Sequence, residues 1–211
     1  MYMNCLIWIL CFMNINLLAP TNRTLPNKPV VMNAELKVAT FGAGCFWCIE
    51  TIFSELKGVK IVVSGYMGGH GDNPTYKQVC TGTTGYAEVC QITYDPNVIS
   101  YPELLQVFWK VHDPTTLNSQ GADHGTQYRS VIYCHNDEQK KQAEFYKKEL
   151  EKTKAFDAPI VTEIAAASKF YPAEAYHQNY YALNGSQPYC KFVIQPKVEK
   201  FKKAFVTKLK K

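Results

Sequence analysis

The chain has 211 residues, of which 46% are hydrophobic and 19% are charged, and this composition excludes a wholly disordered protein. The length is typical of one domain with a short extension. The net charge is +5, from 23 Lys and Arg against 18 Asp and Glu, which is too small to indicate nucleic-acid binding. A domain of this length can bury a sizeable core, so its eight Cys residues are not needed as structural disulfides.

The N-terminal segment, residues 1–31, contains an apolar run at 5–19 followed by a polar, proline-containing linker at 20–31. The run has the length of a signal peptide and is shorter than the roughly 20 apolar residues of a membrane span. Two interpretations remain open. A working signal or anchor predicts an exported or membrane-anchored protein, whereas translation from Met32 predicts a cytoplasmic one. In both cases we expect one folded domain over residues 32–211.

Alternating and helical spacings of apolar residues predict the secondary structure of this domain. In chain order, we expect strand 37–41, helix 45–56, strands 59–66 and 86–94, helix 100–111, strand 129–135, helix 138–154, strand 159–166, and helices 176–183 and 197–210. Two polar loops, 65–75 and 113–128, interrupt the pattern. Antiparallel pairing fits these strands, so the order predicts an α+β fold with helices layered on a sheet.

Cys45 is the first candidate for chemistry, because it follows a strand and a Gly-Ala-Gly turn and begins a helix. A thiol in the first turn lies near unpaired N–H groups and the positive end of the helix dipole, which favour the reactive thiolate. The alternative is a small Cys buried at a tight contact between helix and strand.

Each of the three residues after Cys45 can also be interpreted either as a structural residue or as part of a site. Phe46 and Trp47 are either core residues or an apolar box that holds a small group such as a methyl. Neighbouring helical residues point about 100° apart, so one of the two rings is expected near the surface around Cys45. Cys48 completes a Cys-x-x-Cys pair, which is typical of a redox dithiol or of half a zinc site. The other cysteines of the domain are isolated, so we expect no metal.

Several polar residues elsewhere could complete a site. Glu88 lies in a strand between apolar neighbours and is either an exposed strand residue, which is the usual case, or a site acid. Burial there would raise its pKa and keep it protonated as a general acid. The remaining candidates lie in loops on a rigid scaffold: Tyr76, Tyr128, Asp123, His124 and Cys190. Each of these, taken alone, is better explained as an exposed or packing residue than as part of a site.

Four segments together resemble one family. GCFWCIE at 44–50, NPTYKQVCTGTTGYAEV at 73–89, YDPNVISYPELLQVFWKVHDPT at 94–115 and DHGTQYRSVIY at 123–133 resemble peptide methionine sulfoxide reductase A, in order over residues 38–195. The resemblance implies a ferredoxin-like two-layer sandwich with a mixed, mainly antiparallel sheet. It implies reduction of the S epimer of methionine sulfoxide, free or in oxidised proteins that are thereby repaired. It also implies no metal or organic cofactor, with thioredoxin or another dithiol as the external reductant.

The resemblance also implies roles for residues of the catalytic domain 32–211. Cys45 matches the attacking cysteine, Phe46 and Trp47 match the cage for the substrate methyl, and Glu88 matches the acid that protonates the sulfoxide oxygen. Tyr76 and Tyr128 match the tyrosines that bind that oxygen, and Asp123, with its neighbour His124, matches a supporting polar motif.

The thiol that resolves the oxidised Cys45 is open between two candidates. Cys48 stands where many members have Gly, and the C-terminal segment is Lys-rich instead of carrying the Gly-rich, two-cysteine tail of some members. Cys190 matches the tail cysteine of many relatives, and a loop there would give it reach. A disulfide to Cys48, one helical turn away, would be strained and would unwind that turn. We therefore favour Cys190, and we expect Cys80, Cys90 and Cys134 to be structural.

Two other functions also fit parts of this pattern. One is a non-catalytic module that binds oxidised or apolar Met-bearing segments through Phe46 and Trp47. The other is a general disulfide oxidoreductase that uses Cys45 and Cys48 and does not need Glu88. The intact set of Cys45, Glu88 and the two tyrosines favours the reductase, acting as a monomer on methionine sulfoxide with thioredoxin as its partner and without nucleic acid.

Overall fold

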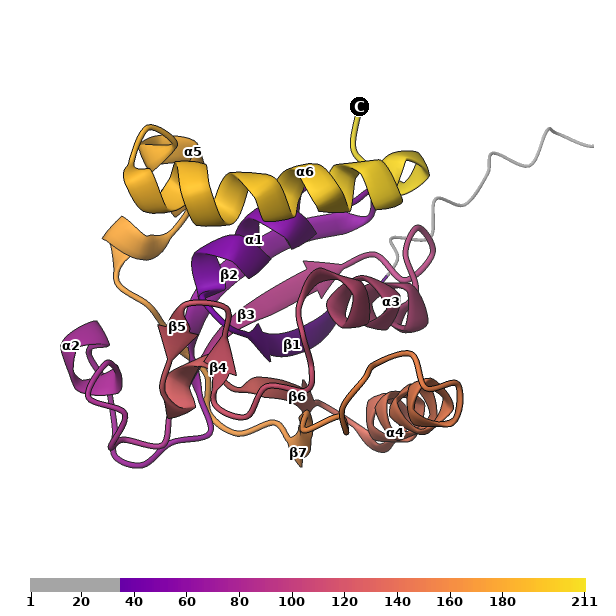
Figure 1. The fold of residues 1–211 in the computed structure, drawn as a ribbon, viewed down its shortest axis with the longest axis horizontal. Helices are drawn as coiled ribbons and strands as arrows, with labels where there is room; N and C mark the ends of the chain where they lie inside the picture. Colours follow the sequence, from indigo (N-terminus) through magenta and orange to yellow (C-terminus); the bar gives the residue numbers. More distant parts are fainter. Residues whose placement is uncertain (1–34) are drawn as a thin grey trace, which may run out of the picture. The chain divides into compact units, whose positions relative to one another are not determined.

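The computed structural model describes residues 35–211 (Figure 1). The predictions for residues 1–31, and for a start at Met32, lie outside these residues. Within them, no helix is long and apolar enough to cross a membrane.

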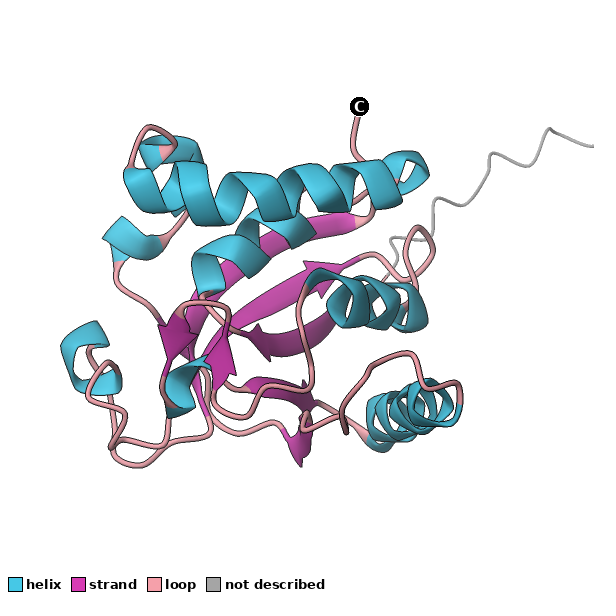
Figure 2. Cartoon of the chain, viewed as in Figure 1, coloured by secondary structure: helices cyan, strands magenta, loops and turns pink. Residues whose placement is uncertain are grey.

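Strands and helices follow one another in a mixed order, which confirms the predicted α+β class (Figure 2). The strands are β1 (Lys37–Ala43), β2 (Val59–Met67), β3 (Ala87–Tyr94), β4 (Ser119–Gln120), β5 (Asp123–His124), β6 (Ser130–Cys134), β7 (Glu163–Ala166) and β8 (Tyr171–Pro172). The α-helices are α1 (Phe46–Ser54), α2 (Tyr76–Val79), α3 (Tyr101–Val111), α4 (Asp137–Lys152), α5 (Tyr180–Asn184) and α6 (Gln195–Ala204).

The main sheet has six strands in the order β7-β6-β1-β3-β2-β8. Every neighbouring pair is antiparallel except β6 with β7, which is parallel. The sheet is therefore mixed and mainly antiparallel, as predicted. β1 lies at its centre, between β6 and β3, and its C-terminal end leads directly into Cys45.

The main core lies between one face of the sheet and helices α1, α3, α4 and α6. Phe41 of β1 packs against Phe53 of α1 and Phe108 of α3, with ring centroids 5.5 and 5.1 Å apart. The opposite face carries a smaller cluster, which contains Met67 and Tyr133. The large core fixes α1 against β1, and this contact sets the position of the first turn of α1.

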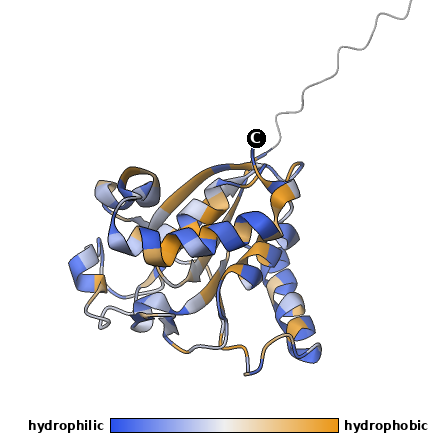
Figure 3. Cartoon of the chain, turned by 45° about the horizontal axis from the view of Figure 1, so that its top comes forward, coloured by the Kyte–Doolittle hydropathy of each residue, from blue (hydrophilic) through white to orange (hydrophobic). Residues whose placement is uncertain are grey.

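The last helix is fastened to the end of α1. Val198 and Phe201 of α6 are buried, and hydrophilic residues alternate with hydrophobic ones along this helix (Figure 3). Beyond it, the Lys210 N–H donates to the Glu55 carbonyl at 2.8 Å and the Lys57 N–H donates to the Lys208 carbonyl at 2.8 Å. The C-terminal segment thus holds α6 in place along α1.

Some predicted elements differ from the structure. The helix expected at 176–183 is a 3₁₀ turn and then α5, because Asn179 between them has a left-handed φ of 53°. The strand expected at 159–166 is paired only over Glu163–Ala166, and the loop 113–128 contains the short β4–β5 hairpin. The loop expected around Cys190 is a turn of π-helix, Cys190–Ile194, that continues into α6.

Candidate active site

Cys45 sits at the junction of β1 and α1. Gly44 before it has a φ of +83°, and a Cβ there would lie 2.6 Å from the Cβ of Gln120, so only glycine fits this turn. Cys45 is the N-cap residue of α1, with φ −57° and ψ 124°, and its side chain makes no capping hydrogen bond. It is 6% exposed. The thiol therefore points to the first turn of the helix from an enclosed position.

The charge state of Cys45 is decided by its burial. Burial raises the pKa of its thiol well above the usual range, and the hydrogen bond to Cys48 adds to this rise. The position at a helix N-terminus favoured a thiolate, but desolvation of the buried sulfur outweighs the helix dipole. Cys45 is thus held as a thiol in the resting structure.

Glu88 lies beneath the same turn, in β3, and is 1% exposed. Its Oε2 accepts a hydrogen bond from the Phe46 N–H at 3.1 Å. Burial, and after it the charge of Cys45, raises the pKa of Glu88 well above its usual range. The carboxyl is therefore protonated near neutrality, which is the form that a general acid needs.

Aromatic rings surround the start of α1. Trp47 stacks on Tyr180 with centroids 3.7 Å apart and an interplanar angle of 8°, and its Nε1 donates to His177 Nδ1 at 3.2 Å. Phe46 packs against His177 and Tyr66, with centroids 5.1 and 6.0 Å apart. Phe46 is buried and Trp47 is half-buried, so Trp47 is the ring at the surface. Burial lowers the pKa of His177, and the neutral ring can accept the Trp47 N–H.

Tyr76 and Tyr128 border this aromatic group from two separate segments. The Tyr76 ring is 4.4 Å from that of His177, and its backbone N–H donates to Glu174 Oε1 at 2.8 Å. Tyr128 ends a 3₁₀ turn next to β6 and is half-buried. Burial raises the pKa of both hydroxyls, and the charge of Glu88 acts in the same direction. Both groups therefore remain O–H donors near Glu88.

Asp123 reaches the site through a tyrosine. Its Oδ2 accepts a hydrogen bond from the Tyr189 hydroxyl at 2.8 Å, and Tyr189 also hydrogen-bonds Cys45, which lowers the Cys45 pKa against the larger effect of burial. His124, the next residue of β5, is exposed. Successive strand residues point to opposite sides, so the structure brings Asp123 to the site and leaves His124 outside it.

The thiols of the domain differ in their surroundings. Cys48 is buried one turn along α1, and its N–H donates to the Cys45 carbonyl at 3.1 Å. Cys190 is also buried, which raises the pKa of its thiol. Cys90 and Cys134 are buried as expected, but Cys80 is exposed at the end of α2. The prediction of a core position for Cys80 was wrong because α2 has a single turn and buries only Val79.

Sequence reasoning missed the residues that complete the aromatic group: Tyr66, Glu174, His177, Tyr180 and Tyr189. Four of them lie between 174 and 189, a stretch whose density of Tyr and His was the available signal. They come far after Cys45 in the chain, and the fold alone brings them to it.

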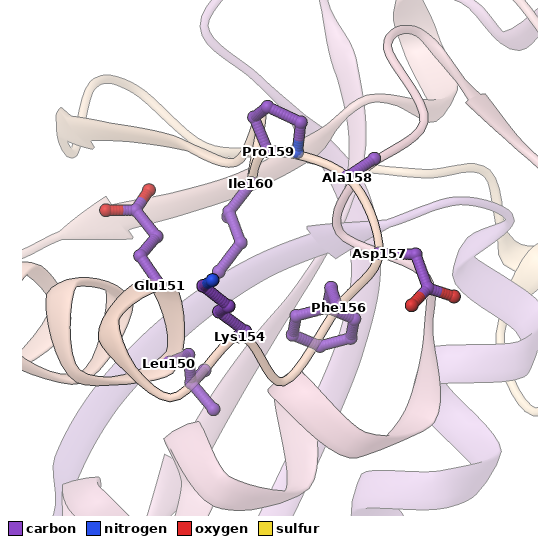
Figure 4. Close-up of a pocket in the computed structure, with 8 residues that line it drawn as sticks. All are labelled: Leu150, Glu151, Lys154, Phe156, Asp157, Ala158, Pro159 and Ile160. Atoms are coloured by element: carbon purple, nitrogen blue, oxygen red, sulfur yellow. The ribbon is translucent and has the colours of Figure 1, made fainter.

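A separate hollow of about 520 Å³ lies at the end of α4 and in the loop after it (Figure 4). Residues such as Phe156 and Ile160 line it, and it contains none of the predicted site residues. Over residues 35–211, the structure also shows no group of three or more His, Cys, Asp or Glu side chains that could hold a metal ion.

The sequence of the chain matches a known family over nearly all of the described residues. The family model described as "Peptide methionine sulfoxide reductase" matches residues 37–209. The chain belongs to this family. The enzyme is therefore an oxidoreductase, as the sequence predicted.

Relatives and solved structures agree with this assignment. The "Peptide methionine sulfoxide reductase MsrA" of Polynucleobacter asymbioticus is 54% identical over 170 residues, which cover 81% of this chain and 90% of that protein. The protein of the same name from Saccharolobus solfataricus is 53% identical over 175 residues, covering 83% and 98%. The reduced form of Mxr1 from Saccharomyces cerevisiae superposes with a TM-score of 0.67 at 38% identity, covering 74% of this chain and 90% of that one. Methionine sulfoxide reductase A of Corynebacterium diphtheriae gives a TM-score of 0.64 at 35% identity, covering 71% and 75%.

Proposed function

We propose that this enzyme reduces the S epimer of methionine sulfoxide, free and within proteins, to methionine, and that it thereby repairs oxidised proteins. One observation carries the proposal: a buried, protonated Glu88 lies close enough to Cys45 for their charges to interact, at the edge of an aromatic group. A nucleophile and a proton donor at one apolar site are what oxygen transfer from a sulfoxide requires.

The reaction transfers one oxygen atom from the substrate to Cys45. The Cys45 sulfur attacks the sulfoxide sulfur as its thiol proton leaves, and Glu88 protonates the sulfoxide oxygen. The protonated oxygen shifts from the substrate sulfur to the Cys45 sulfur: the substrate S–O bond and the bond between the two sulfurs break, an S–O bond to Cys45 forms, methionine is released, and Cys45 becomes a sulfenic acid. The proton lost by Cys45 replaces the one that Glu88 gives, so the enzyme's proton count is unchanged.

Substrate orientation follows from three fixed contacts. The rings of Phe46 and Trp47 enclose the methyl group, and the hydroxyls of Tyr76 and Tyr128 donate to the oxygen. Cys45 approaches the sulfur from a third direction. A sulfur whose methyl, oxygen and attacking group are each fixed is accepted in one handedness only, which supports a single epimer as substrate; that this epimer is S follows from the family resemblance.

Recycling needs a second thiol and an external reductant. A thiol condenses with the Cys45 sulfenic acid to form a disulfide and water, and a dithiol, which we propose to be thioredoxin, then reduces the disulfide. Cys190 and Cys48 are the two candidates for the resolving thiol. No metal or organic cofactor takes part in these steps.

The proposal extends to the fold family, the oligomeric state and the compartment of the protein. The chain order β1, α1, β2, β3, α3, β6 and the sheet order β6-β1-β3-β2 support a ferredoxin-like core. We propose a monomer. For the compartment, we propose the cytoplasm if synthesis starts at Met32, and export or membrane anchoring if residues 1–31 act as a signal.

A single-turnover assay of the full chain tests the function. Without added reductant, S-methionine sulfoxide should give one methionine per chain, and the R epimer should give none. Cys45→Ser should abolish the reaction, whereas the matched variant Cys134→Ser should retain it, because Cys134 lies away from the site at the end of β6. Methionine release from the Cys45→Ser variant, or equal use of both epimers, would contradict the proposal.

A further inference from the structure

A lysine side chain from α6 lies beside the second thiol of the site. Lys197 Nζ is 4.0 Å from Cys48 Sγ. The two residues belong to helices that pack against each other, and the hydrogen bond from Lys210 to Glu55 fastens α6 and the segment after it to the end of α1. The ammonium group is therefore held next to the thiol by the fold.

Cys45 and Cys48 are arranged as a pair at the helix start. Cys45 is the N-cap residue with an extended ψ of 124°, and the Cys48 N–H donates to its carbonyl at 3.1 Å. The strain expected for a disulfide inside a helix applies to two residues that both have helical backbone angles. Here Cys45 lies outside the helix, in the setting of Cys-x-x-Cys pairs that form reversible disulfides.

Four groups set the charge of Cys48. A hydrogen bond from the Cys45 thiol lowers the Cys48 pKa, burial opposes it, and the charge of Lys197 lowers it further. The charges of Asp123 and Cys90 raise the Cys48 pKa. Lys197 is the one cation among these groups, and Cys45, as the donor, keeps the shared proton.

We propose that Lys197 is a positioning residue that holds Cys48 as a thiolate, and that Cys48 is thereby the thiol that resolves the Cys45 sulfenic acid. The inference rests on the proposed function, because that reaction supplies the sulfenic acid. The Cys48 thiolate attacks the Cys45 sulfur, an S–S bond forms and the S–O bond breaks. The Cys48 sulfur is oxidised, the Cys45 sulfur is reduced, and the hydroxide that leaves takes a proton from solvent to become water.

The position of Cys190 favours Cys48 as the resolving thiol. Cys190 also lies near Cys45, whose charge raises the Cys190 pKa after burial does, but it is fully buried at the start of a π-helical turn that continues into α6. Cys48 is already in the same turn as Cys45 and needs no movement of α6. The expectation that Cys190 has the greater reach depended on a loop leading up to it, and in the structure this loop covers only residues 185–187, with helical residues from 188 onward.

The test follows one turnover of the full chain, with methionine release and trapping of the sulfenic acid by dimedone measured separately. Lys197→Met should release methionine at the unchanged rate but keep its sulfenic acid longer, by about threefold for each unit by which the Cys48 pKa rises. The delay should vanish at high pH, where Cys48 ionises without help. Lys197→Arg should restore the rate, and the control Lys203→Met, on the exposed face of α6, should leave it unchanged.

Two measurements on the unmodified chain complete the test. Peptide mapping after turnover should find a Cys45–Cys48 disulfide, and alkylation by iodoacetamide as a function of pH should show Cys48 ionising below Cys45. A Cys45–Cys190 disulfide, or an unchanged sulfenic-acid lifetime in Lys197→Met, would overturn the inference and leave the reductase function standing. Failure of the unmodified chain to release methionine would overturn both.

Discussion

Glu88 is a buried carboxyl that can donate a proton in the reaction but destabilises the folded protein when it is ionised. It is 1% exposed, its Oε2 accepts one backbone N–H from Phe46, and burial raises its pKa. A carboxyl in such a place is stable only while it is protonated. The same property makes it a proton donor near neutral pH and a source of instability above it.

The catalytic side of this property is tested by Glu88→Gln. The amide keeps the hydrogen bond from Phe46 but cannot give a proton to the sulfoxide oxygen, so the rate of methionine release should fall by about 100-fold or more. In the unmodified enzyme the rate should decrease as the pH rises through the raised pKa of Glu88. Single-turnover rates as a function of pH measure both effects, and a Gln variant with full activity would exclude Glu88 as the acid.

Glu88→Gln should have the opposite effect on stability: it should lower the rate but raise the free energy of unfolding. Because the folded pKa lies above the unfolded value of about 4.3, protonated Glu88 contributes its full stabilisation below that value. The contribution declines as the pH rises and is lost once the pH passes the folded pKa. Glu88→Gln should therefore gain in unfolding free energy relative to the unmodified chain, by an amount that grows as the pH rises from the unfolded pKa of Glu88 towards its raised folded pKa. Urea unfolding of both proteins measures the difference, and a difference that does not depend on pH would contradict this assignment.

At the scale of elements, α1 is the helix around which the site is assembled. Its first turn carries the thiols, and its second carries Glu50, which is 3% exposed and accepts the Asn179 N–H at 2.9 Å. Asn179 has a left-handed backbone and stands directly before α5, which contributes Tyr180 to the Trp47 stack. The hydrogen bond from Asn179 to Glu50 thus links the segment that contains Tyr180 to the helix that begins at Cys45.

Glu50→Ala tests the role of this hydrogen bond. Loss of the acceptor leaves the Asn179 N–H unpaired, and we expect the unfolding free energy to fall by about 1–3 kcal/mol. The Trp47 cage should loosen as well, so the KM for methionine sulfoxide should rise more than the rate of the chemical step falls. Glu149→Ala, which removes an exposed partner of Lys152, is the matched control and should change neither. An unchanged KM in Glu50→Ala would show that Glu50 does not position the cage.

The sequence predicted local elements better than the contacts between them. The strand before Cys45, the helix after it and the alternating strand around Glu88 were all predicted, because each depends on the spacing of nearby residues. The break at Asn179 depends on Glu50, a partner distant in the chain, and the π-helical turn at Cys190 is buried in the main core formed by other segments. The sequence left Cys45 open between a reactive thiolate and a buried thiol for the same reason, since burial by other segments decides its charge state.

At the scale of the whole molecule, the larger of the two clusters of buried apolar residues lies on one face of the sheet. The large core under α1, α3, α4 and α6 contains Phe41, which is fully buried in the central strand. Phe41 is four residues before Cys45, so the core and the site share one strand. Loosening of the core and loss of the site are therefore expected to coincide.

Phe41→Ala measures this coupling. The substitution should lower the unfolding free energy by about 3–5 kcal/mol, and activity should disappear at the same urea concentration as the folded-state tryptophan fluorescence. Leu183→Ala, at a residue that is 76% exposed, should change stability by less than about 0.5 kcal/mol. Loss of activity well before loss of fluorescence would show instead that the site opens independently of the core.

The position of both thiols in the first turn of α1 has a kinetic consequence. The sulfoxide that oxidises the enzyme and the dithiol that regenerates it must reach the same few atoms at the start of α1, and each excludes the other while it is there. The two half-reactions therefore alternate. At high sulfoxide concentration the substrate binds at the start of α1 in the oxidised enzyme, so the steady-state rate passes through a maximum and then declines, and additional reductant restores it.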